Sequence, residues 1–234
     1  MPRSVLVTGG NRGIGLAIAR ALAADGDAVT VTYRSGEAPE GLGAVKCEIT
    51  DTESVNAAFD EVEREQGPIE VLVANAGVTR DGLLMRMSDE DYATVVDTNL
   101  GGTFKCVRRA STSMIRKRYG RIVLIGSVVG LYGSPGQANY AATKSGLVGL
   151  ARAVTREIGQ RGITANVVAP GFIETDMTAS LPEDRKNAYL GAIPAGRFGA
   201  VDEVAAAVRF LASDAAAYVS GAVLPVDGGM GMGH

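Results

Sequence analysis

The fold is decided near the start of the chain, by the stretch Ser4-Val5-Leu6-Val7-Thr8-Gly9-Gly10-Asn11-Arg12-Gly13-Ile14-Gly15. Its first part is uncharged and rich in β-branched side chains, which predicts a buried strand over residues 4–8. The glycines that follow allow a sharp turn and a close approach of the backbone to a ligand. A helical pattern begins at once, and a helix N-terminus at this place presents free N–H groups to a phosphate. Ile18 takes the place of the third glycine of the G-x-G-x-x-G pattern, so an ordinary strand–helix turn remains an alternative.

Short apolar runs and longer amphipathic runs alternate along the rest of the chain. Strands are predicted at residues 4–8, 28–33, 44–49, 71–74, 121–126, 164–169 and 222–226. Helices are predicted at residues 14–24, 52–66, 89–96, 103–118, 139–160 and 201–212. Strands that alternate with helices in this way pair in parallel, with right-handed crossovers and helices on both faces. We therefore expect one domain over residues 1–234, an α/β fold with a doubly wound, Rossmann-like parallel sheet of about seven strands.

Composition excludes several kinds of protein. Hydrophobic residues make up 46% and charged residues 21% of the 234 residues, which is ordinary for a globular protein. The net charge of −3 gives no general attraction to nucleic acid or to an anionic membrane. The single histidine, His234, is the last residue, so we expect no Ser-His-Asp triad and no metal site built on histidines. Cys47 and Cys106 form no CxxC motif and no signal-peptide pattern is present, which favours the cytoplasm.

In an open α/β sheet, ligands bind beyond the carboxyl ends of the strands. After the second predicted strand comes Arg34, at the place where NAD-binding sheets have an acidic residue for the ribose 2′-hydroxyl. Arg34 and Arg12 together suit a 2′-phosphate, which favours NADPH over NADH. A solvated surface arginine is the alternative interpretation of Arg34.

Other cofactor contacts are predicted at the remaining strand ends. Glu48 and Ile49 follow the third strand, where they can contact an adenine edge, and the small residues of Asn75-Ala76-Gly77 let the backbone pass beside a cofactor. Thr175 follows the sixth strand and can bind a nicotinamide carboxamide. The full predicted set is Gly9, Asn11, Arg12, Gly13, Ile14, Gly15, Arg34, Glu48, Ile49, Asn75, Ala76, Gly77, Tyr140, Lys144, Pro170, Gly171, Ile173 and Thr175.

Ser127, Tyr140 and Lys144 predict a general acid that needs no histidine. Ser127 follows the fifth strand, and Tyr140 and Lys144 share one helix face, because side chains four residues apart have Cβ atoms about 5–6 Å apart. A nearby ammonium, together with the positive ring of an oxidised nicotinamide, lowers the pKa of a tyrosine from its usual value of about 10. Such a phenol exchanges protons as a general acid and base. A surface Tyr–Lys pair is the alternative, which the glycine loop and Ser127 disfavour.

Together these motifs resemble the short-chain dehydrogenase/reductase family over essentially the whole chain. The matching features are Thr8-Gly9 with Gly13-x-Gly15, Asn75-Ala76-Gly77, Asn99, Ser127, Tyr140-x-x-x-Lys144 and Pro170-Gly171. Within that family, residues 78–87, 136–140, 170–178 and 227–230 resemble the bacterial 3-oxoacyl-[acyl-carrier-protein] reductases. Two positions depart from the family pattern: Ala74 stands where asparagine is frequent, and Glu48 where aspartate is commoner.

The resemblance implies an enzyme, an NADPH-dependent oxidoreductase that reduces a 3-oxoacyl carrier-protein thioester to its 3-hydroxyacyl form in fatty-acid synthesis. It implies that Tyr140 donates the proton and that Ser127 hydrogen-bonds the carbonyl oxygen. It implies that Lys144 lowers the pKa of Tyr140 and holds the nicotinamide ribose. Asn99 resembles the family asparagine that holds a water for proton supply. A homotetramer is implied as well, formed through the helix at residues 139–160 and the last strand.

The partner implied by the resemblance is an acyl carrier protein, which is acidic. Arg118 and Arg161 match basic positions that these reductases use for docking, with solvated helix ends as the alternative. Residues 172–198 are expected to form a mobile lid over the substrate. An acyl channel is expected from a set of large side chains, with core packing as the alternative: Met85, Met87, Tyr132, Phe172 and Tyr189.

Two other functions remain open from the sequence. The first is a ketoreductase of the same family that acts on a coenzyme A thioester, a polyketide or a small ketone. The second is a non-catalytic dinucleotide-binding sensor. The presence of Ser127, Tyr140 and Lys144 speaks against a sensor, because pure binding requires no proton donor.

Overall fold

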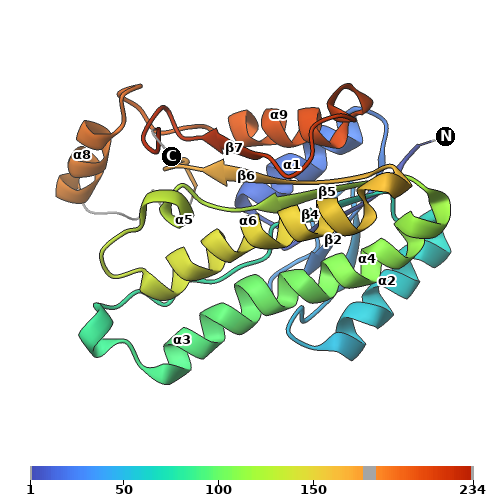
Figure 1. Cartoon of the computed structure of the whole chain (residues 1–234), viewed down its shortest axis with the longest axis horizontal. Coiled ribbons are helices and arrows are strands. Elements are labelled where there is room, and N and C mark those ends of the chain that lie inside the picture. The colour runs from blue at the N-terminus through green and yellow to red at the C-terminus, as the bar shows by residue number, and fades with distance from the viewer. Residues whose placement is uncertain (1, 176–182, 233–234) are drawn as a thin grey trace.

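One parallel sheet organises the protein, and the computed structural model describes it over residues 2–175 and 183–232. Its seven strands lie in the order β3-β2-β1-β4-β5-β6-β7. They are β1 (Ser4–Thr8), β2 (Ala28–Tyr33), β3 (Gly43–Lys46), β4 (Val71–Ala74), β5 (Gly120–Ile125), β6 (Ile163–Pro170) and β7 (Val223–Val226). The predicted Rossmann-like, doubly wound sheet is thereby confirmed (Figure 1).

Helices connect the strands. They are α1 (Gly13–Ala24), α2 (Thr52–Gln66), α3 (Asp89–Val96), α4 (Thr103–Lys117), α5 (Val129–Tyr132), α6 (Ala138–Ile158), α8 (Glu183–Ala192) and α9 (Val201–Ala212). Shorter turns of helix are η1 (Leu84–Arg86), η2 (Asp97–Gly102), η3 (Gly159–Arg161) and η4 (Asp214–Ala216). The sequence predicts neither α5 nor α8, because α5 is a single turn and α8 lacks a regular apolar face.

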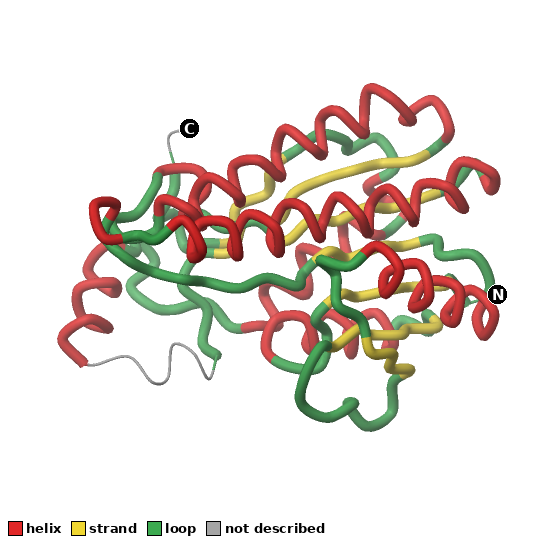
Figure 2. The backbone as a smooth tube through the Cα atoms, turned by 90° about the horizontal axis from the view of Figure 1, so that it is seen from below, coloured by secondary structure: helices red, strands yellow, loops and turns green. Residues whose placement is uncertain are grey.

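Each face of the sheet carries its own hydrophobic core. On one face α1 and α9 pack together over the strands, with Ile18 and Val208 fully buried between them and the sheet. On the other face α2, α4 and α6 bury Phe59, Met114 and Leu147. Figure 2 views the molecule from below, with helices in front of the strands on this side. Because both faces are covered, the strands need apolar side chains at successive positions, and this produces the uninterrupted apolar runs of the sequence.

The order of the strands reverses next to β1. β1 pairs with β2 on one side and with β4 on the other, and Thr8 lies opposite Ala74 at the carboxyl ends. The connections from these two strands run in opposite directions, so the segments that follow them diverge. This is the position at which an open α/β sheet binds a ligand.

No helix in the two described ranges is both long enough and apolar enough to cross a bilayer.

Candidate active site

The loop after β1 is shaped by glycines. Gly9 and Gly13 have φ values of +62° and +53°, in the left-handed region that favours glycine. A Cβ on Gly15 would lie 2.5 Å from the Gly9 carbonyl oxygen, so only glycine lets α1 begin this close to the loop. Arg12 precedes α1 without a capping bond from its side chain, and the first turn has no acidic residue. The first N–H groups of α1 therefore face outward without a side-chain acceptor, and this cradle fits the pyrophosphate of a dinucleotide.

Hydrogen bonds tie the end of β4 to this loop. Thr8 Oγ1 accepts from the backbone N–H groups of Asn75 and Ala76 at 3.0 and 3.1 Å. The Asn75 amide donates in return to the carbonyl oxygens of Thr8 and Gly9 at 3.1 and 2.9 Å. A Cβ on Gly9 would lie 2.9 Å from Ala76 Cα. The residues that are predicted to contact a cofactor after β1 and after β4 are thus hydrogen-bonded to one another and lie side by side.

Arg34, Glu48 and Ile49 lie at the ends of β2 and β3. The Arg34 guanidinium is 3.7 Å from the Glu48 carboxylate, and 62% of the Arg34 side chain is exposed. Such a pair is weak, so Arg34 is free to bind a stronger anion. Glu48 turns its Oε1 to the Thr50 hydroxyl at 2.9 Å, and Ile49 is buried. The Asn11 amide donates to the backbone after β2, which holds the glycine loop beside this end of the site.

Lys144 carries an ammonium group in the protein interior. Only 5% of the residue is exposed, and Nζ donates to the Ile125 carbonyl oxygen at 2.7 Å. Burial lowers the pKa of Lys144 from 10.5 to about 8. Nζ lies 5.5 Å from the centroid of the Tyr140 ring, one helical turn earlier on α6. An ammonium has three donors, and the described residues take one of them, so Lys144 can bind further acceptors such as ribose hydroxyls.

The hydroxyl of Tyr140 faces Ser127, which follows β5. Burial raises the pKa of Tyr140 above its usual value, the hydrogen bond with Ser127 lowers it, and the Asp81 carboxylate raises it. For the protein alone this net direction is opposite to the one that the sequence predicts from Lys144 and an oxidised nicotinamide. The reason is that removing a phenolate from water costs more free energy than the hydrogen bond with Ser127 returns, and the negative charge of Asp81 adds to that cost. Ser127 Oγ also accepts from the Val129 N–H at 3.2 Å, which fixes the hydroxyl.

Asn99 is fully buried in η2, a π-helical segment between α3 and α4. Its Oδ1 accepts from the Val78 N–H at 2.8 Å, and its Nδ2 donates to the Val78 carbonyl oxygen at 2.9 Å. Nδ2 also lies 3.4 Å from Thr143 Oγ1 on α6. A Cβ on Gly77 would lie 3.1 Å from Asn99 Oδ1. The side chain of Asn99 therefore clamps the segment after β4 against α6, and π-helical turns of this kind are frequent at functional sites.

The segment after β6 closes the site from the other side. β6 ends at Pro170, and a Cβ on Gly171 would lie 2.8 Å from the backbone that follows β7. Ile173 is buried. Thr175 reaches the start of α1, where a Cβ on Gly13 would lie 4.0 Å from its methyl group. The predicted contacts after the first and sixth strands thus face each other.

Aromatic side chains surround this segment. The Phe172 ring stacks on Tyr189 of α8 at 4.0 Å and lies 5.9 Å from the Phe198 ring. Tyr132 is half exposed at 46%, whereas Met85 is 96% exposed and points to solvent. The structure therefore brings together the later members of the expected acyl channel and leaves Met85 apart from them. Residues 176–182 of the expected lid lie outside the described residues.

Comparison with known proteins places the chain in a family. The family model described as enoyl-(acyl carrier protein) reductase matches residues 9–231. The 3-oxoacyl-[acyl-carrier-protein] reductase MabA of Mycobacterium tuberculosis (strain ATCC 25618 / H37Rv) is 57% identical over 232 residues, which cover 99% of this chain and 94% of the relative. The 3-oxoacyl-[acyl-carrier-protein] reductase FabG of Escherichia coli (strain K12) is 49% identical over 235 residues, 97% of this chain and 96% of the relative. The chain belongs to the short-chain dehydrogenase/reductase family. The predicted family and fold class are confirmed.

Membership of the short-chain dehydrogenase/reductase family makes the protein an oxidoreductase with a nicotinamide dinucleotide as its cofactor. The glycine cradle, the outward N–H groups of α1 and the spare donors of Lys144 fit such a cofactor. The roles of the individual residues remain predictions.

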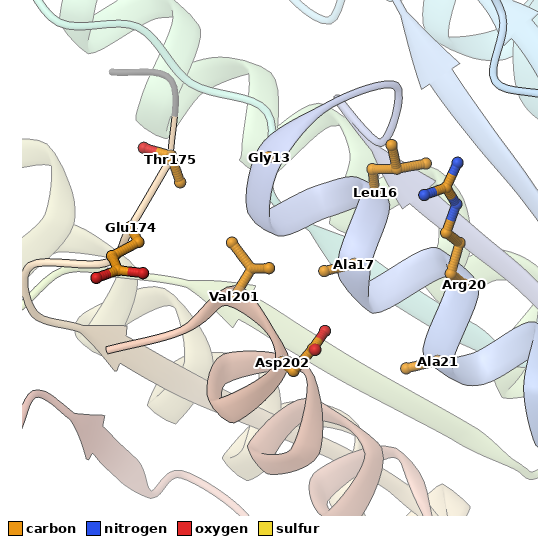
Figure 3. A pocket seen from close by; sticks show the side chains of 9 residues that line it. All are labelled: Gly13, Leu16, Ala17, Arg20, Ala21, Glu174, Thr175, Val201 and Asp202. Carbon is orange, nitrogen blue, oxygen red and sulfur yellow. The ribbon is translucent and has the colours of Figure 1, made fainter. Parts of the chain in front are cut away.

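A cavity among the described residues lies apart from Ser127, Tyr140 and Lys144. Its volume is about 530 Å³, and it opens between α1, the start of α9 and the segment after β6 (Figure 3). Leu16 and Val201 form apolar walls, and Arg20 and Asp202 stand at its edges. Ser127, Tyr140 and Lys144 do not line it. The cavity therefore does not contain the predicted proton donor, Tyr140.

Arg118 and Arg161 lie at the opposite edge of the sheet from Tyr140. Arg118 ends α4 in a left-handed conformation with φ of 55°, just before β5 begins. Arg161 lies in η3, just before β6 begins. A Cβ on Gly162 would lie 2.6 Å from the Arg118 carbonyl oxygen, so the two arginines are neighbours. Ser127, which faces Tyr140, follows the carboxyl end of β5, so these arginines and Tyr140 lie at opposite ends of the same strands.

Sequence reasoning missed three residues next to Tyr140. They are Asp81, Gln137 and Asn139, which form hydrogen bonds between the segment after β4 and the start of α6. All three lie in the stretches 78–87 and 136–140 that carry the family resemblance, but the sequence gives none of them a role. Only the tertiary fold brings Asp81 next to Gln137 at the start of α6.

Proposed function

We propose that the protein reduces 3-oxoacyl-[acyl-carrier-protein] to 3-hydroxyacyl-[acyl-carrier-protein] with NADPH, as a step of fatty-acid synthesis. The observation that carries the proposal is the group formed by Ser127, Tyr140 and the buried Lys144, together with a glycine cradle that fits a dinucleotide. The names of relatives at 49–57% identity support the substrate.

The residues divide the work as follows. The reduced nicotinamide, when bound, supplies the hydride that adds to the substrate carbonyl carbon. Tyr140 gives its hydroxyl proton to the carbonyl oxygen, so that the ketone becomes a secondary alcohol. Ser127 accepts the Val129 N–H, which leaves its own hydrogen to stabilise the negative charge that develops on the same oxygen. Lys144 directs its remaining N–H donors towards the ribose and stabilises the phenolate that Tyr140 becomes. Asn99 holds the segment after β4, beside the cofactor, through its hydrogen bonds to Val78.

Arg34 and Arg12 support NADPH over NADH. Arg34 is mostly exposed and holds its carboxylate partner only weakly, so a 2′-phosphate can replace that partner with charge-assisted bonds. We expect Arg34→Ala to lower the ratio of kcat/KM for NADPH to that for NADH by roughly tenfold or more. Arg20→Ala, an exposed arginine farther along α1, should leave the ratio unchanged. An unchanged ratio in Arg34→Ala contradicts the NADPH proposal.

A carrier protein and a tetramer are part of the proposal. Arg118 and Arg161 form a basic pair that suits an acidic carrier protein, but they face away from Tyr140 of the same chain. A carrier protein bound there therefore has to serve the site of another protomer, which a homotetramer through α6 and β7 supplies. Charge reversal at both arginines should raise KM for the carrier-bound substrate and spare a small thioester. An equal loss on both substrates contradicts docking at these residues.

The decisive test is NADPH oxidation with acetoacetyl thioester by the protein and by Tyr140→Phe. The substitution keeps the ring and removes the proton donor, so kcat should fall by about 10²-fold or more. Tyr119→Phe is the matched control, because its hydroxyl bonds Asp214 at the amino edge of the sheet. A higher kcat/KM with coenzyme A thioesters or small ketones than with carrier-bound substrate would reassign the substrate. Binding of NADPH without oxidation by any ketone would reassign the protein as a sensor.

A further inference from the structure

Asn139 is a fully buried residue that uses both ends of its side-chain amide inside the protein. Its Nδ2 donates to the Arg80 carbonyl oxygen at 2.9 Å, and its Oδ1 accepts from the Tyr140 N–H at 2.7 Å. A longer contact of 3.5 Å joins Nδ2 to the Asp91 carbonyl oxygen. One side chain therefore connects the segment after β4, the start of α3 and the start of α6. A buried amide that is bonded at both ends is rigid, because water cannot replace a bond that breaks there.

The bond falls on Tyr140 because of the place of Tyr140 in its helix. α6 begins at Ala138, so the Tyr140 N–H belongs to the first turn and has no carbonyl acceptor earlier in the helix. Gln137, the N-cap, makes no side-chain hydrogen bond to the helix, and its amide donates to Asp81 at 3.2 and 3.1 Å instead. Among the described residues, Asn139 thus supplies the acceptor for the Tyr140 N–H.

The carbonyl oxygen of Tyr140 is held by a second buried side chain. It accepts from the Thr143 hydroxyl at 2.8 Å, and Thr143 is buried. Thr143 Oγ1 lies 3.4 Å from Asn99 Nδ2, which also donates to the Val78 carbonyl oxygen. Both backbone polar groups of Tyr140 are therefore fixed by buried side chains, and both connections lead to residues 78–80.

Resting on the reductase function proposed above, the geometry points to Asn139 as a positioning residue that sets where the Tyr140 hydroxyl lies relative to the substrate carbonyl. Proton transfer requires the two oxygens to be within hydrogen-bond reach, about 2.6–3.2 Å apart. Asn139 acts on this distance only through the backbone of Tyr140. A misplacement of about 1 Å can lower a rate by about 10²-fold, so the loss of this bond affects the chemical step more than it affects binding.

Asn139→Ala removes both bonds, and Asn166→Ala is its matched control. Asn166 is also fully buried, and it joins β6 to the segment before β7. Its Nδ2 donates to the Val219 carbonyl oxygen at 2.8 Å, and its Oδ1 accepts from the Ala222 N–H at 3.0 Å. The two substitutions thus delete the same amide in a similar setting, but only the first one affects Tyr140. We expect the two variants to lose similar amounts of thermal stability.

Kinetics with acetoacetyl thioester and NADPH separate positioning from a structural role. In Asn139→Ala, kcat should fall by about tenfold or more, while KM and the Kd of NADPH change by less than about threefold. In Asn166→Ala, kcat should stay within about twofold of the parent value. In the Tyr140→Phe background, Asn139→Ala should lower kcat no further, because the group that it positions is gone. A kcat that falls equally in both asparagine variants, or that falls as much in the Tyr140→Phe background, overturns the inference.

Hydrogen exchange at the start of α6 gives a readout that needs no substrate. The amide protons there, that of Tyr140 among them, should exchange about tenfold faster or more in Asn139→Ala than in Asn166→Ala, as measured by mass spectrometry on cofactor-free protein. Equal exchange in the two variants overturns the inference. If the alanine variants do not fold, Asn139→Ser and Asn166→Ser replace them; failure of Asn139→Ser to fold means that the side chain is purely structural, which also overturns the inference. If the parent protein reduces no 3-oxoacyl thioester, the proposed function fails, while the exchange rates still decide whether Asn139 holds Tyr140.

Discussion

The buried ammonium of Lys144 has a cost in stability that can be measured. Its pKa is about 8 in the folded protein and 10.5 in its usual, water-exposed state. Between these values the unfolded chain binds more protons than the folded protein, so the free energy of unfolding rises with pH. The stability is highest above pH 10.5 and is lost as pH falls to about 8. At 1.36 kcal/mol per unit, the whole difference corresponds to about 3 kcal/mol.

Replacement of Lys144 by Met removes this titration and keeps a chain of similar length in the interior. Relative to Lys144→Met, the protein should gain about 2 kcal/mol in free energy of unfolding between pH 7 and about pH 9.5, which is the part of the difference that falls within this interval. Other groups that titrate in the range, such as Cys47, Cys106 and Tyr140, are present in both proteins and largely cancel. Lys144→Met should therefore be relatively most stable at neutral pH, where it is also inactive.

The assay is urea unfolding of both cofactor-free proteins at the two pH values and equal protein concentration. The quantity of interest is the change with pH of the difference between the two free energies of unfolding. A difference that does not change with pH means that the pKa of Lys144 is the same in the folded protein and in the unfolded chain, as for a solvated ammonium. A difference that changes in the opposite direction means that a partner stabilises the ammonium. Either result refutes the account of Lys144 as a charge held against the cost of burial.

Two further predictions concern the glycine loop and a helix cap. Gly15→Ala should cost about 1–3 kcal/mol of stability and weaken dinucleotide binding, because its Cβ would lie 2.5 Å from both the Gly9 oxygen and the Asn75 amide nitrogen. Chemical denaturation measures the loss of stability, and a binding titration measures the loss of affinity. Gly149→Ala is the matched control, because nothing lies within 4 Å of a Cβ at that position. Ser88→Ala should cost about 1 kcal/mol, because Ser88 Oγ accepts from the Asp91 N–H at 3.0 Å and caps α3; a thermal midpoint equal to that of the parent protein contradicts this.

The sequence predicts most of the fold because local signals and burial agree. The predicted helices at residues 52–66, 89–96 and 201–212 have the observed bounds. Their ends are marked locally, by Gly67 with φ of +82° in one case and by Ser88 in another. Where no local residue marks the end of an element, the predicted bound differs from the observed one. The helix predicted at residues 103–118 ends as α4 at Lys117, with Arg118 as its left-handed C-cap, and β5 begins at Gly120, one residue before the predicted strand.

The sequence predicts which residues belong to the candidate site from their spacing along the chain, but it does not predict the contacts that their side chains make. Tyr140 and Lys144 share a helix face because four residues make about one helical turn, and this can be predicted from their spacing in the sequence alone. That Lys144 turns its ammonium to Ile125 depends on how closely α6 packs on the end of β5, which no spacing encodes. The same holds for Asp81, whose neighbour Gln137 belongs to a distant segment. Contacts of this kind arise from the tertiary fold alone.

Burial has one effect on both titrating groups, and this explains how a protein whose sole histidine ends the chain can work as a reductase. Removal from water disfavours the charged form, so the pKa of Tyr140 rises while the pKa of Lys144 falls to about 8. Tyr140 is then a phenol throughout the neutral range, ready to give a proton. Lys144 still carries most of its positive charge at pH 7, and the phenolate left by proton transfer is the anion that this charge can stabilise. Because that stabilisation appears only as the proton leaves, it favours the transition state over the bound ketone. A histidine titrating near neutrality would be protonated only in part at the same pH, whereas the buried phenol stays fully protonated.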